Sequence, residues 1–490
     1  MSRRNRRLRC SRGSLCCVLG IALCLAVACT TRSMRRIKLL EGVTETREYR
    51  RGIDEIRKSS KLYGNLNRFL YWFDQGVLFH YAGEYDSSLV CLQNAEQVLD
   101  DLYARSITNE AASLLTNDNL RPYRGRRYEQ VFLHQLMSLD YLAKGEYDES
   151  LVETRKVQLV FDRFKSKDKG RDKYNDNGMS HFMSSLVFDV QDERDNAAIS
   201  LYKSVAAYRN GPIRLPSQVA EVAYYRLLAD DREEDIKLLE LPKPPVPPEK
   251  VHGVDRDATE IVVVGYAGKG PVLDEIVFWG TYVMGGMLIG YYKDPNGDTV
   301  AVALPAPPLP QSEMRKMSQG ERTRAGRTFH IKFALPTAVR RPSKVHGFSA
   351  GTASSGRIKS LMLADTDLLL ERDIEDNRTA TLIRTTIRVV LRTIAAQKAK
   401  QKLETASPIA NLLVSVGTDV LADQLEKADT RLSFLLPKSI HITRIPVEPG
   451  MHRVEASALN RSGGVIDTRA WDNVTVGAGE KTFLFYPAVM

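Results

Sequence analysis

The sequence predicts a multidomain protein with an all-α N-terminal half of helical repeats and an α+β region that ends in a small β-sandwich-like domain. The first observation is a repeat: GEYDSSLVCLQ (Gly83–Gln93) returns as GEYDESLVETR (Gly145–Arg155), 62 positions later. The second is a proline-rich break, LELPKPPVPPEK (239–250), beyond which strand-like segments replace helical periodicity. At 490 residues, the chain is too long for one ordinary core.

The N-terminus is typical of a secretion signal spanning residues 1–28. A basic stretch, MSRRNRRLRCSR, precedes a short apolar run from Leu15 to Ala28. Ala26-Val27-Ala28-Cys29 resembles the bacterial lipobox, in which the cysteine is diacylated and becomes the first mature residue. Lipidation of Cys29 would make residues 29–39 a tether to the bacterial outer membrane, facing the periplasm or the cell surface. An uncleaved anchor and cleavage without lipid are the alternatives.

Charge and cysteine content fit an exported protein. Six arginines of the signal account for most of the net charge of +10, so the mature chain is nearly balanced and we expect no nucleic-acid partner. Only Cys91 remains beyond Cys29, so the folded body has no intramolecular disulfide, and we interpret Cys91 as a small buried hydrophobe.

Residues 40–238 are predicted to form a tetratricopeptide (TPR)-like helical domain. Paired helices bury one apolar stripe against each other, small residues allow close crossing, and a turn glycine accepts positive φ. A third and weaker copy carries Phe182, Ala198, Tyr202 and Val205. The residues of the first two copies at these positions are Trp72, Gly76, Phe79, Gly83, Tyr85, Ser88, Leu92, Ala95, Tyr141, Gly145, Tyr147, Ser150 and Val157.

An insertion between the first two copies, LLTNDNLRPYRGRRYEQ (114–130), accounts for their long spacing. It is polar, aromatic and rich in arginine, so it could bind a partner or an anionic or sugar-like ligand. A structural plug over the concave repeat surface is the other interpretation. The predicted partner-binding residues are Asn117, Asp118, Arg121, Tyr123, Arg124, Tyr128 and Glu129.

The string LTNDNLRPYRGRRYEQVFLHQLMSLDYLAKGEYDESLVETRK resembles the hallmark of an uncharacterised family of bacterial TPR-containing lipoproteins. Its members pair an ND…YxGxxYE loop with a YLxxG…VExR repeat. VVVGYAGKGP (262–271) and KADTRLSFLLP (427–437) resemble two further landmarks of the family. The resemblance implies an envelope lipoprotein without assigned activity, whose relatives accompany lipoproteins similar to activators of peptidoglycan synthases.

The residue pattern divides the chain from residue 239 onward into three segments. Residues 239–254 are expected to be an extended proline-rich linker, 255–437 an α+β domain with long helices at about 376–430, and 438–490 a β-strand domain. Arg384, Arg388 and Arg392 form a basic ridge, interpreted as a solvated face paired with nearby acids, with a ligand-binding role as the alternative. The apolar runs 276–292 and 407–422 are interpreted as core segments, with contact to lipid as the alternative.

No catalytic, metal or cofactor site is predicted. Gly347-Phe348-Ser349-Ala350-Gly351 has the spelling of a hydrolase nucleophile motif, but neither flanking segment fits, so a flexible loop is expected. Gly265, Gly268 and Gly270 fail the phosphate-loop pattern and indicate a tight turn. The eight histidines show no i, i+4 pair, as a zinc site would.

The sequence as a whole favours a non-enzymatic cell-envelope lipoprotein that acts as a TPR-type scaffold for other envelope proteins, with a role in envelope or cell-wall assembly. A glycan- or peptidoglycan-binding module is the main alternative, and a serine hydrolase using Ser349 is a remote one.

Overall fold

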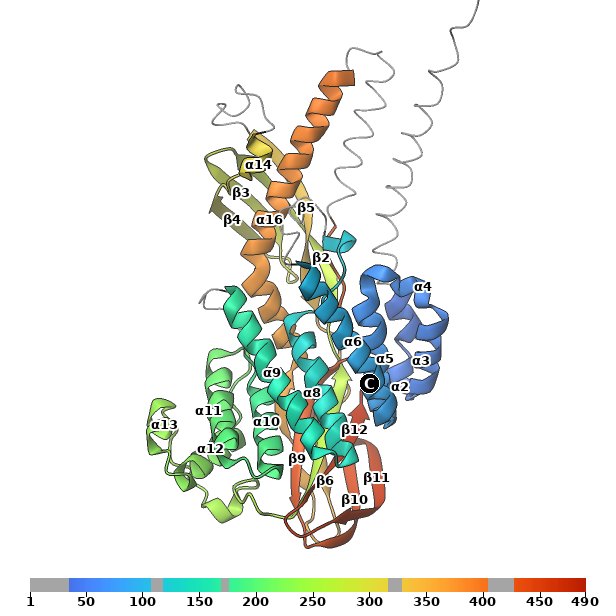
Figure 1. The fold of residues 1–490 in the computed structure, drawn as a ribbon, viewed down its shortest axis with the longest axis vertical. Coiled ribbons are helices and arrows are strands. Elements are labelled where there is room, and N and C mark those ends of the chain that lie inside the picture. The colour runs from blue at the N-terminus through green and yellow to red at the C-terminus, as the bar shows by residue number, and fades with distance from the viewer. Residues whose placement is uncertain (1–34, 107–117, 169–175, 316–327, 404–426) are drawn as a thin grey trace, which may run out of the picture.

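Helices dominate the N-terminal half and antiparallel sheets the C-terminal half, which confirms the predicted order of helical and α+β regions. A computed structural model describes residues 35–106, 118–168, 176–315, 328–403 and 427–490. The helices curve around one side of the sheets, and a sheet with a long helix projects as an arm (Figure 1). Residues 1–34, including Cys29 and the predicted signal, lie outside the described residues, as do Asn117 and the apolar run 407–422.

Four helical hairpins follow one another in the described part of the N-terminal half. Within each hairpin the second helix turns back along the first. The hairpins are α5 (Arg68–Ala82) with α6 (Tyr85–Ser106), α8 (Arg127–Lys144) with α9 (Tyr147–Asp168), α10 (Gly178–Val190) with α11 (Arg194–Asn210), and α12 (Ser217–Ala229) with α13 (Glu233–Leu238). The shorter helical elements are α2 (Val43–Thr46), α3 (Tyr49–Lys58), α4 (Ser60–Tyr63), η1 (Asn65–Asn67), η2 (Asp118–Leu120) and η3 (Pro248–Lys250).

The repeated GEYD stretch forms the turn of the first two hairpins. Gly83 and Gly145 adopt φ of 77° and 75°, where a side chain would be strained. The amides of Gly83 and Glu84 donate to the carbonyls of His80 and Phe79, and the second copy repeats this pair of bonds. The GEYD stretch occurs twice because it forms the same helix C-terminus and turn in both hairpins.

Small residues bring the paired helices close together. Ser88 Oγ donates to the Gly76 carbonyl at 2.9 Å, and in the second hairpin Ser138 Oγ and Ser150 Oγ lie 2.9 Å apart. A Cβ at Gly76 would lie 2.6 Å from a Leu92 methyl, so that crossing requires glycine. Ser138 replaces glycine in the second hairpin and fills the same space with a hydrogen bond.

The strands form three four-stranded sheets in the described part of the chain. One sheet has the order β12-β1-β9-β8, the second β11-β10-β6-β7 and the third β4-β3-β2-β5. The bounds are β1 (Glu260–Lys269), β2 (Val272–Val283), β3 (Met287–Lys293), β4 (Thr299–Pro305), β5 (Thr328–Val339), β6 (Gly347–Gly351), β7 (Ile358–Lys359), β8 (Leu361–Asp365), β9 (Pro437–Pro446), β10 (Gly450–Leu459), β11 (Val465–Val476) and β12 (Lys481–Ala488).

The predicted boundary at residue 438 does not separate two domains. β1 pairs in parallel with β12 and antiparallel with β9, and β10 pairs with β6. The first two sheets enclose a shared apolar core that includes Val263, Phe348 and Tyr486. Strands from both sides of residue 438 therefore build one sandwich, and the C-terminal strands complete it.

The third sheet and α16 (Thr366–Leu403) form the arm. Phe278, Phe333 and Leu335 of the sheet share an apolar core with Leu382 and Val390 of the helix. The predicted helix start near residue 376 is ten residues late, because Asp365 caps the helix by accepting from the amides of Asp367 and Leu368. A four-residue helix, α14 (Gln311–Met314), precedes residues 316–327, which are outside the described part.

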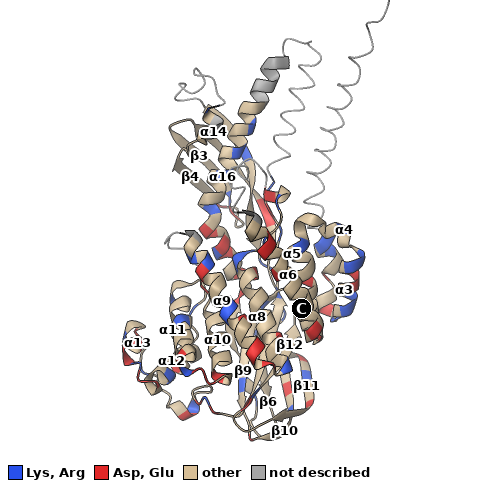
Figure 2. Cartoon of the chain, in the orientation of Figure 1, with Lys and Arg blue, Asp and Glu red and all other residues tan. Residues whose placement is uncertain are grey.

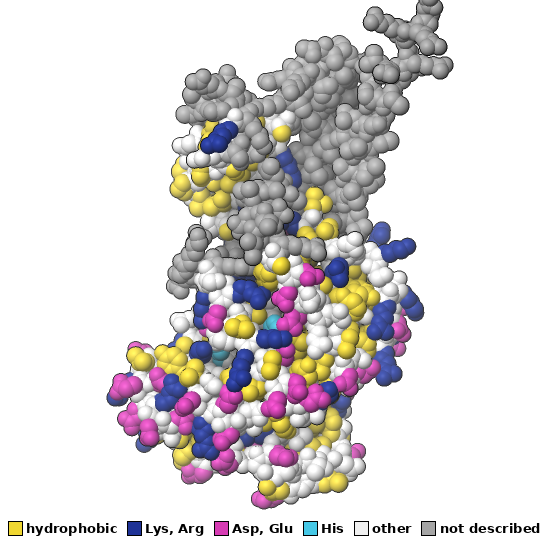
Figure 3. Space-filling view, in the orientation of Figure 1, with side chains coloured by type: hydrophobic (Ala, Val, Ile, Leu, Met, Phe, Trp, Pro, Cys, Tyr) yellow, Lys and Arg dark blue, Asp and Glu magenta, His cyan; other side chains and the backbone are white. Residues whose placement is uncertain are grey.

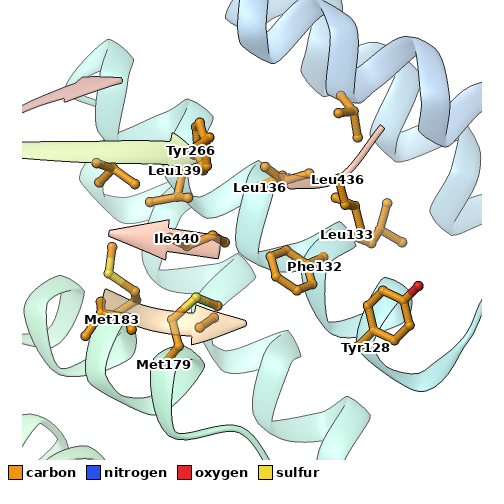
Figure 4. Close-up of a cluster of buried hydrophobic side chains, with 14 of the residues drawn as sticks. Tyr128, Phe132, Leu133, Leu136, Leu139, Met179, Met183, Tyr266, Leu436 and Ile440 are labelled. Atoms are coloured by element: carbon orange, nitrogen blue, oxygen red, sulfur yellow. The ribbon is translucent and has the colours of Figure 1, made fainter. Parts of the chain in front are cut away.

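The largest apolar core joins the helices to the first sheet. Side chains of α8 and α10 meet Tyr266 of β1 and Ile440 of β9 (Figure 4). A buried polar link reinforces the contact, because the two ring nitrogens of His80 lie 2.5 Å from Asp140 Oδ1 and 2.8 Å from Tyr266 Oη.

The predicted proline-rich linker is packed against the helices as well. Leu241 is buried, and the Val246 carbonyl accepts from Tyr225 Oη at 2.6 Å. Residues 239–254 therefore do not act as a free spacer.

Candidate functional site: an arginine-rich cleft

The interrepeat loop (residues 118–129) is held by a segment about 300 residues further along the chain (residues 427–437). Arg431 donates to the carbonyls of Arg121 at 2.8 Å and Asp118 at 2.7 Å. In return, Asn119 Nδ2 donates to the carbonyls of Lys427 and Ala428 at 3.2 and 3.0 Å. Guanidinium and amide groups thus satisfy backbone carbonyls on both sides, and the two segments form one wall.

Glu129 is the buried centre of this wall. Its carboxylate accepts from the backbone amides of Arg126 at 2.6 Å and Ser433 at 2.5 Å, and from Tyr123 Oη at 2.5 Å. The bond to Arg126 also caps the start of α8. Burial raises the pKa of Glu129 to about 7, and the three hydrogen bonds oppose that rise only in part.

The two tyrosines of the loop are not exposed platforms. Tyr123 and Tyr128 are each 6% exposed, and the Arg431 guanidinium lies 5.1 Å from the centre of the Tyr123 ring. Burial raises the pKa of both tyrosines well above the usual value. In this conformation Tyr123, Tyr128 and Glu129 cannot contact a partner, and they hold the loop in place instead. This placement corresponds to the plug interpretation for these three residues.

A cleft of about 370 Å³ opens between the interrepeat loop, α16 and the end of β5. Figure 2 shows basic residues spaced along α16. Among the residues that the structure describes, eight basic side chains and three carboxylates line the cleft, an excess of five positive charges. These residues are Arg121, Arg124, Arg126, Arg127, Arg384, Arg388, Lys427 and Arg431, with Asp118, Asp373 and Asp429.

Asp118 is shared by three arginines. Its carboxylate lies 3.5 Å from Arg121, 3.8 Å from Arg384 and 3.3 Å from Arg388. Arg388 is only 2% exposed, so the interpretation of the ridge as a solvated face is wrong at this position. Arg384 and Arg388 line the cleft because both lie close to Asp118 of the loop, whereas Arg392, one turn further along α16, is not among its lining residues. Asp118 thus gathers three guanidinium groups at one edge of the cleft.

The side chain of Arg124 packs near an aromatic ring. Its guanidinium lies 5.7 Å from the centre of the Tyr103 ring. Burial, and secondarily the positive charge of Arg121, lowers the pKa of Arg124. The predicted residues Asp118, Arg121 and Arg124 thus come together in the cleft.

Sequence reasoning missed the contribution of the 427–437 segment and of Asp373. The segment was noted only as a family landmark, KADTRLSFLLP, yet it supplies Lys427, Asp429 and Arg431. Asp429 and Arg431, which have opposite charges and stand next to a buried apolar stretch, are the local signal for a packed polar anchor.

The other sequence candidates lie elsewhere. Ser349 is inside strand β6, opposite Ser457 and Lys359, so the expected flexible loop is wrong and the strand-to-helix turn of a hydrolase is absent at this residue. Gly265 lies within β1 against Phe348, and only Gly268 has a turn-like φ, of 64°. Cys91 is buried, as expected, and burial raises the pKa of its thiol to about 11.

One set of possible metal ligands appears only in three dimensions. Glu96, His134 and Glu153, from three different helices, have ligand atoms within 4.8 Å of one another. Lys156 Nζ already lies 2.9 Å from carboxylate oxygens of both Glu96 and Glu153. A lysine ammonium therefore supplies the positive charge that a metal would bring, and we do not assign a metal to this cluster.

No family model matches the chain, and neither the curated proteins nor the solved structures include a significant match. The resemblance to a TPR-containing lipoprotein family thus rests on the motifs quoted above. In the described ranges, the helices are all too short or too polar to cross a bilayer.

Proposed function

We propose that this protein is a non-enzymatic lipoprotein of the bacterial cell envelope, whose TPR-like hairpins form a scaffold and whose arginine-rich cleft binds an acidic segment of a partner protein. The observation that carries the proposal is the excess of five positive charges among the described residues that line a cleft of about 370 Å³. Guanidinium groups held by packing bind carboxylates in bidentate fashion at a small entropic cost.

The construction of the cleft supports binding rather than catalysis. Its walls are fixed by hydrogen bonds from Arg431 and Asn119, so the basic groups are positioned before a ligand arrives. Arg121 and Arg384 retain side-chain exposures of 34% and 40%, so a ligand can reach them. The positive charge of the cleft suits a short acidic segment of a partner, and lipidation of Cys29 would raise the local concentration of the cleft at the membrane.

A photo-crosslinker placed at Arg384 in the full-length chain tests the proposal in intact cells. We expect capture of a protein whose crosslinked peptide is rich in Asp and Glu, and we expect Arg121→Glu to reduce capture at least tenfold, because one charge reversal in such a pair costs several kcal/mol. Arg461→Glu, an exposed reversal in the turn between β10 and β11, is the matched control and should leave capture unchanged. Equal capture in the two variants would refute the role of the cleft.

An anionic glycan is the second candidate, because the same guanidinium groups can bind glycan carboxylates and phosphates. Sedimentation of the full-length protein with purified peptidoglycan separates the two functions. Binding that is lost in Arg121→Glu and retained in Arg461→Glu would favour the glycan, while binding equal in both would come from another surface.

The envelope location has its own test. We expect labelled palmitate to enter the wild-type protein and to be absent from Cys29→Ala. Label that persists in the alanine variant would contradict lipidation at Cys29, without bearing on the cleft.

A further inference from the structure

The arm has one covered face and one open face. Alternate side chains of β2, β3 and β5 point toward α16 and are buried, including Phe278, Tyr292 and Phe333. The opposite side chains form what we call the outer face. Its exposed members include Trp279 at 41%, Ile289 at 55% and Tyr291 at 48%.

The strand register makes the outer face continuous. Trp279 lies opposite Tyr291 on one side and Lys332 on the other, and the next outward row places Thr281 between Ile289 and His330. The rings of Trp279 and Tyr291 stack with their centres 5.8 Å apart. Together they border a shallow hollow of about 520 Å³. Figure 3 shows hydrophobic side chains gathered over the region of β3 and β4.

Around the stacked aromatic pair, the charged side chains of the outer face are basic. Residues 277–283, 287–293, 299–305 and 328–334 contain no Asp or Glu, whereas Lys293 and Lys332 point outward and are exposed. Glu275, further along β2 and opposite Pro336, faces the same way but is partly buried near the cleft. Two copies of the chain meeting through the aromatic part of the face would bring like charges together, whereas a negatively charged surface complements them.

The outer face also continues into the arginine-rich cleft. Ala334 is the next outward residue of β5 after Lys332, and it lines the cleft together with Pro336. The molecule therefore presents, along one strand, an apolar aromatic surface that passes into a cluster of guanidinium groups. Trp and Tyr favour the headgroup level of a bilayer, and basic groups beside them are attracted to anionic lipids.

We propose that the outer face of the arm lies on an anionic phospholipid bilayer, with Trp279 and Tyr291 at headgroup level and Lys293 and Lys332 near lipid phosphates. This contact is separate from the acyl chains expected on Cys29 and would orient the arm and the cleft relative to the membrane.

The fluorescence of Trp279 tests the proposal directly. In the full-length chain, Trp72→Phe and Trp471→Phe leave Trp279 as the single tryptophan. We expect its emission to shift to the blue, and brominated lipid to quench it, with vesicles of phosphatidylcholine and phosphatidylglycerol but not of phosphatidylcholine alone. Because quenching reports contact at residue 279, lipid on Cys29 does not produce this signal.

Two test substitutions and one matched control complete the experiment. In the single-tryptophan protein, Tyr291→Glu should weaken vesicle binding at Trp279 at least tenfold, and Lys332→Ala about fivefold. Met451→Glu, at a residue 67% exposed on β10, should change it less than twofold. Circular dichroism confirms that each variant is folded.

Two results would overturn the proposal. One is emission from Trp279 that does not respond to anionic vesicles. The other is protection of Trp279 fluorescence from quenching by acrylamide in the lipid-free protein. Protection that persists on dilution would mean that another part of the chain covers the face. Protection that is lost on dilution would mean that a second copy of the chain covers it.

Discussion

Replacing Glu129 by alanine should release the interrepeat loop from the 427–437 segment. The substitution removes the acceptor for three donors, the amides of Arg126 and Ser433 and the hydroxyl of Tyr123. A buried donor left without an acceptor costs about 1–3 kcal/mol. Because water can enter as the loop opens, we expect a total near the lower end of the sum, about 4 kcal/mol.

Hydrogen exchange followed by mass spectrometry measures this loss locally. A change of about 4 kcal/mol in the opening free energy corresponds to about a thousandfold faster exchange. The increase should appear in peptides covering residues 119–126 and 430–436 and not in α11 or α12, because the bonds of Glu129 do not reach those helices.

Glu146→Ala is the matched control for this prediction. Glu146 lies at the helix turn, pairs with Lys144 and has a side chain 40% exposed, so its removal should cost less than about 1 kcal/mol. If Glu129→Ala raises exchange of the two peptides less than about tenfold, the wall does not depend on this carboxylate and our account of the loop is wrong.

Two further predictions concern stability. Burial raises the pKa of Glu129 to about 7, so the folded state retains a proton that the unfolded chain releases near pH 4.5. The stabilisation that this bound proton gives the folded state is complete below pH 4.5 and is lost as the pH rises through 7. Relative to Glu129→Gln, the wild-type free energy of unfolding by urea should fall by about 3 kcal/mol over this range, and parallel profiles would contradict the raised pKa. Gly145→Ala, at φ of 75°, should destabilise the protein by about 1 kcal/mol, whereas Gly42→Ala, at an αR position with open space around it, should be neutral in the same thermal melts, and equal effects would count against the turn geometry.

The hairpins could be predicted from sequence because their signals are local. In the first hairpin, the small residue Gly76, the turn glycine Gly83 and the small residue Ser88 all lie within about twenty positions of one another. The strands were identified by composition, but their partners were not. Nothing near β1 indicates that its neighbours are β9 and β12, since pairing depends on which apolar faces meet after the chain has collapsed.

The candidate site could be predicted only in part, because some of its residues are close in sequence and others are brought together by long-range packing. Asp118, Arg121 and Arg124 are close in sequence and were recognised as a basic, polar loop. Tyr123 is covered by Arg431, which lies about 300 residues away in the sequence. The exposure of Arg388 could not be predicted because its acid, Asp118, belongs to another element. Composition reveals which groups could bind a ligand, and long-range packing decides which of them are accessible.

The position of β1 in the chain has a consequence for folding during synthesis. Its ten residues are nearly all buried and apolar, and they leave the ribosome more than 160 residues before β9 and more than 200 before β12. Until both neighbours arrive, the strand exposes two unsatisfied edges, which are templates for aggregation. A chain that lost its last ten residues would keep every helical hairpin and still never close its central sheet. If the chain is exported, as proposed above, this arrangement favours crossing the membrane unfolded and closing the sheet only on the far side, once the final strand has emerged.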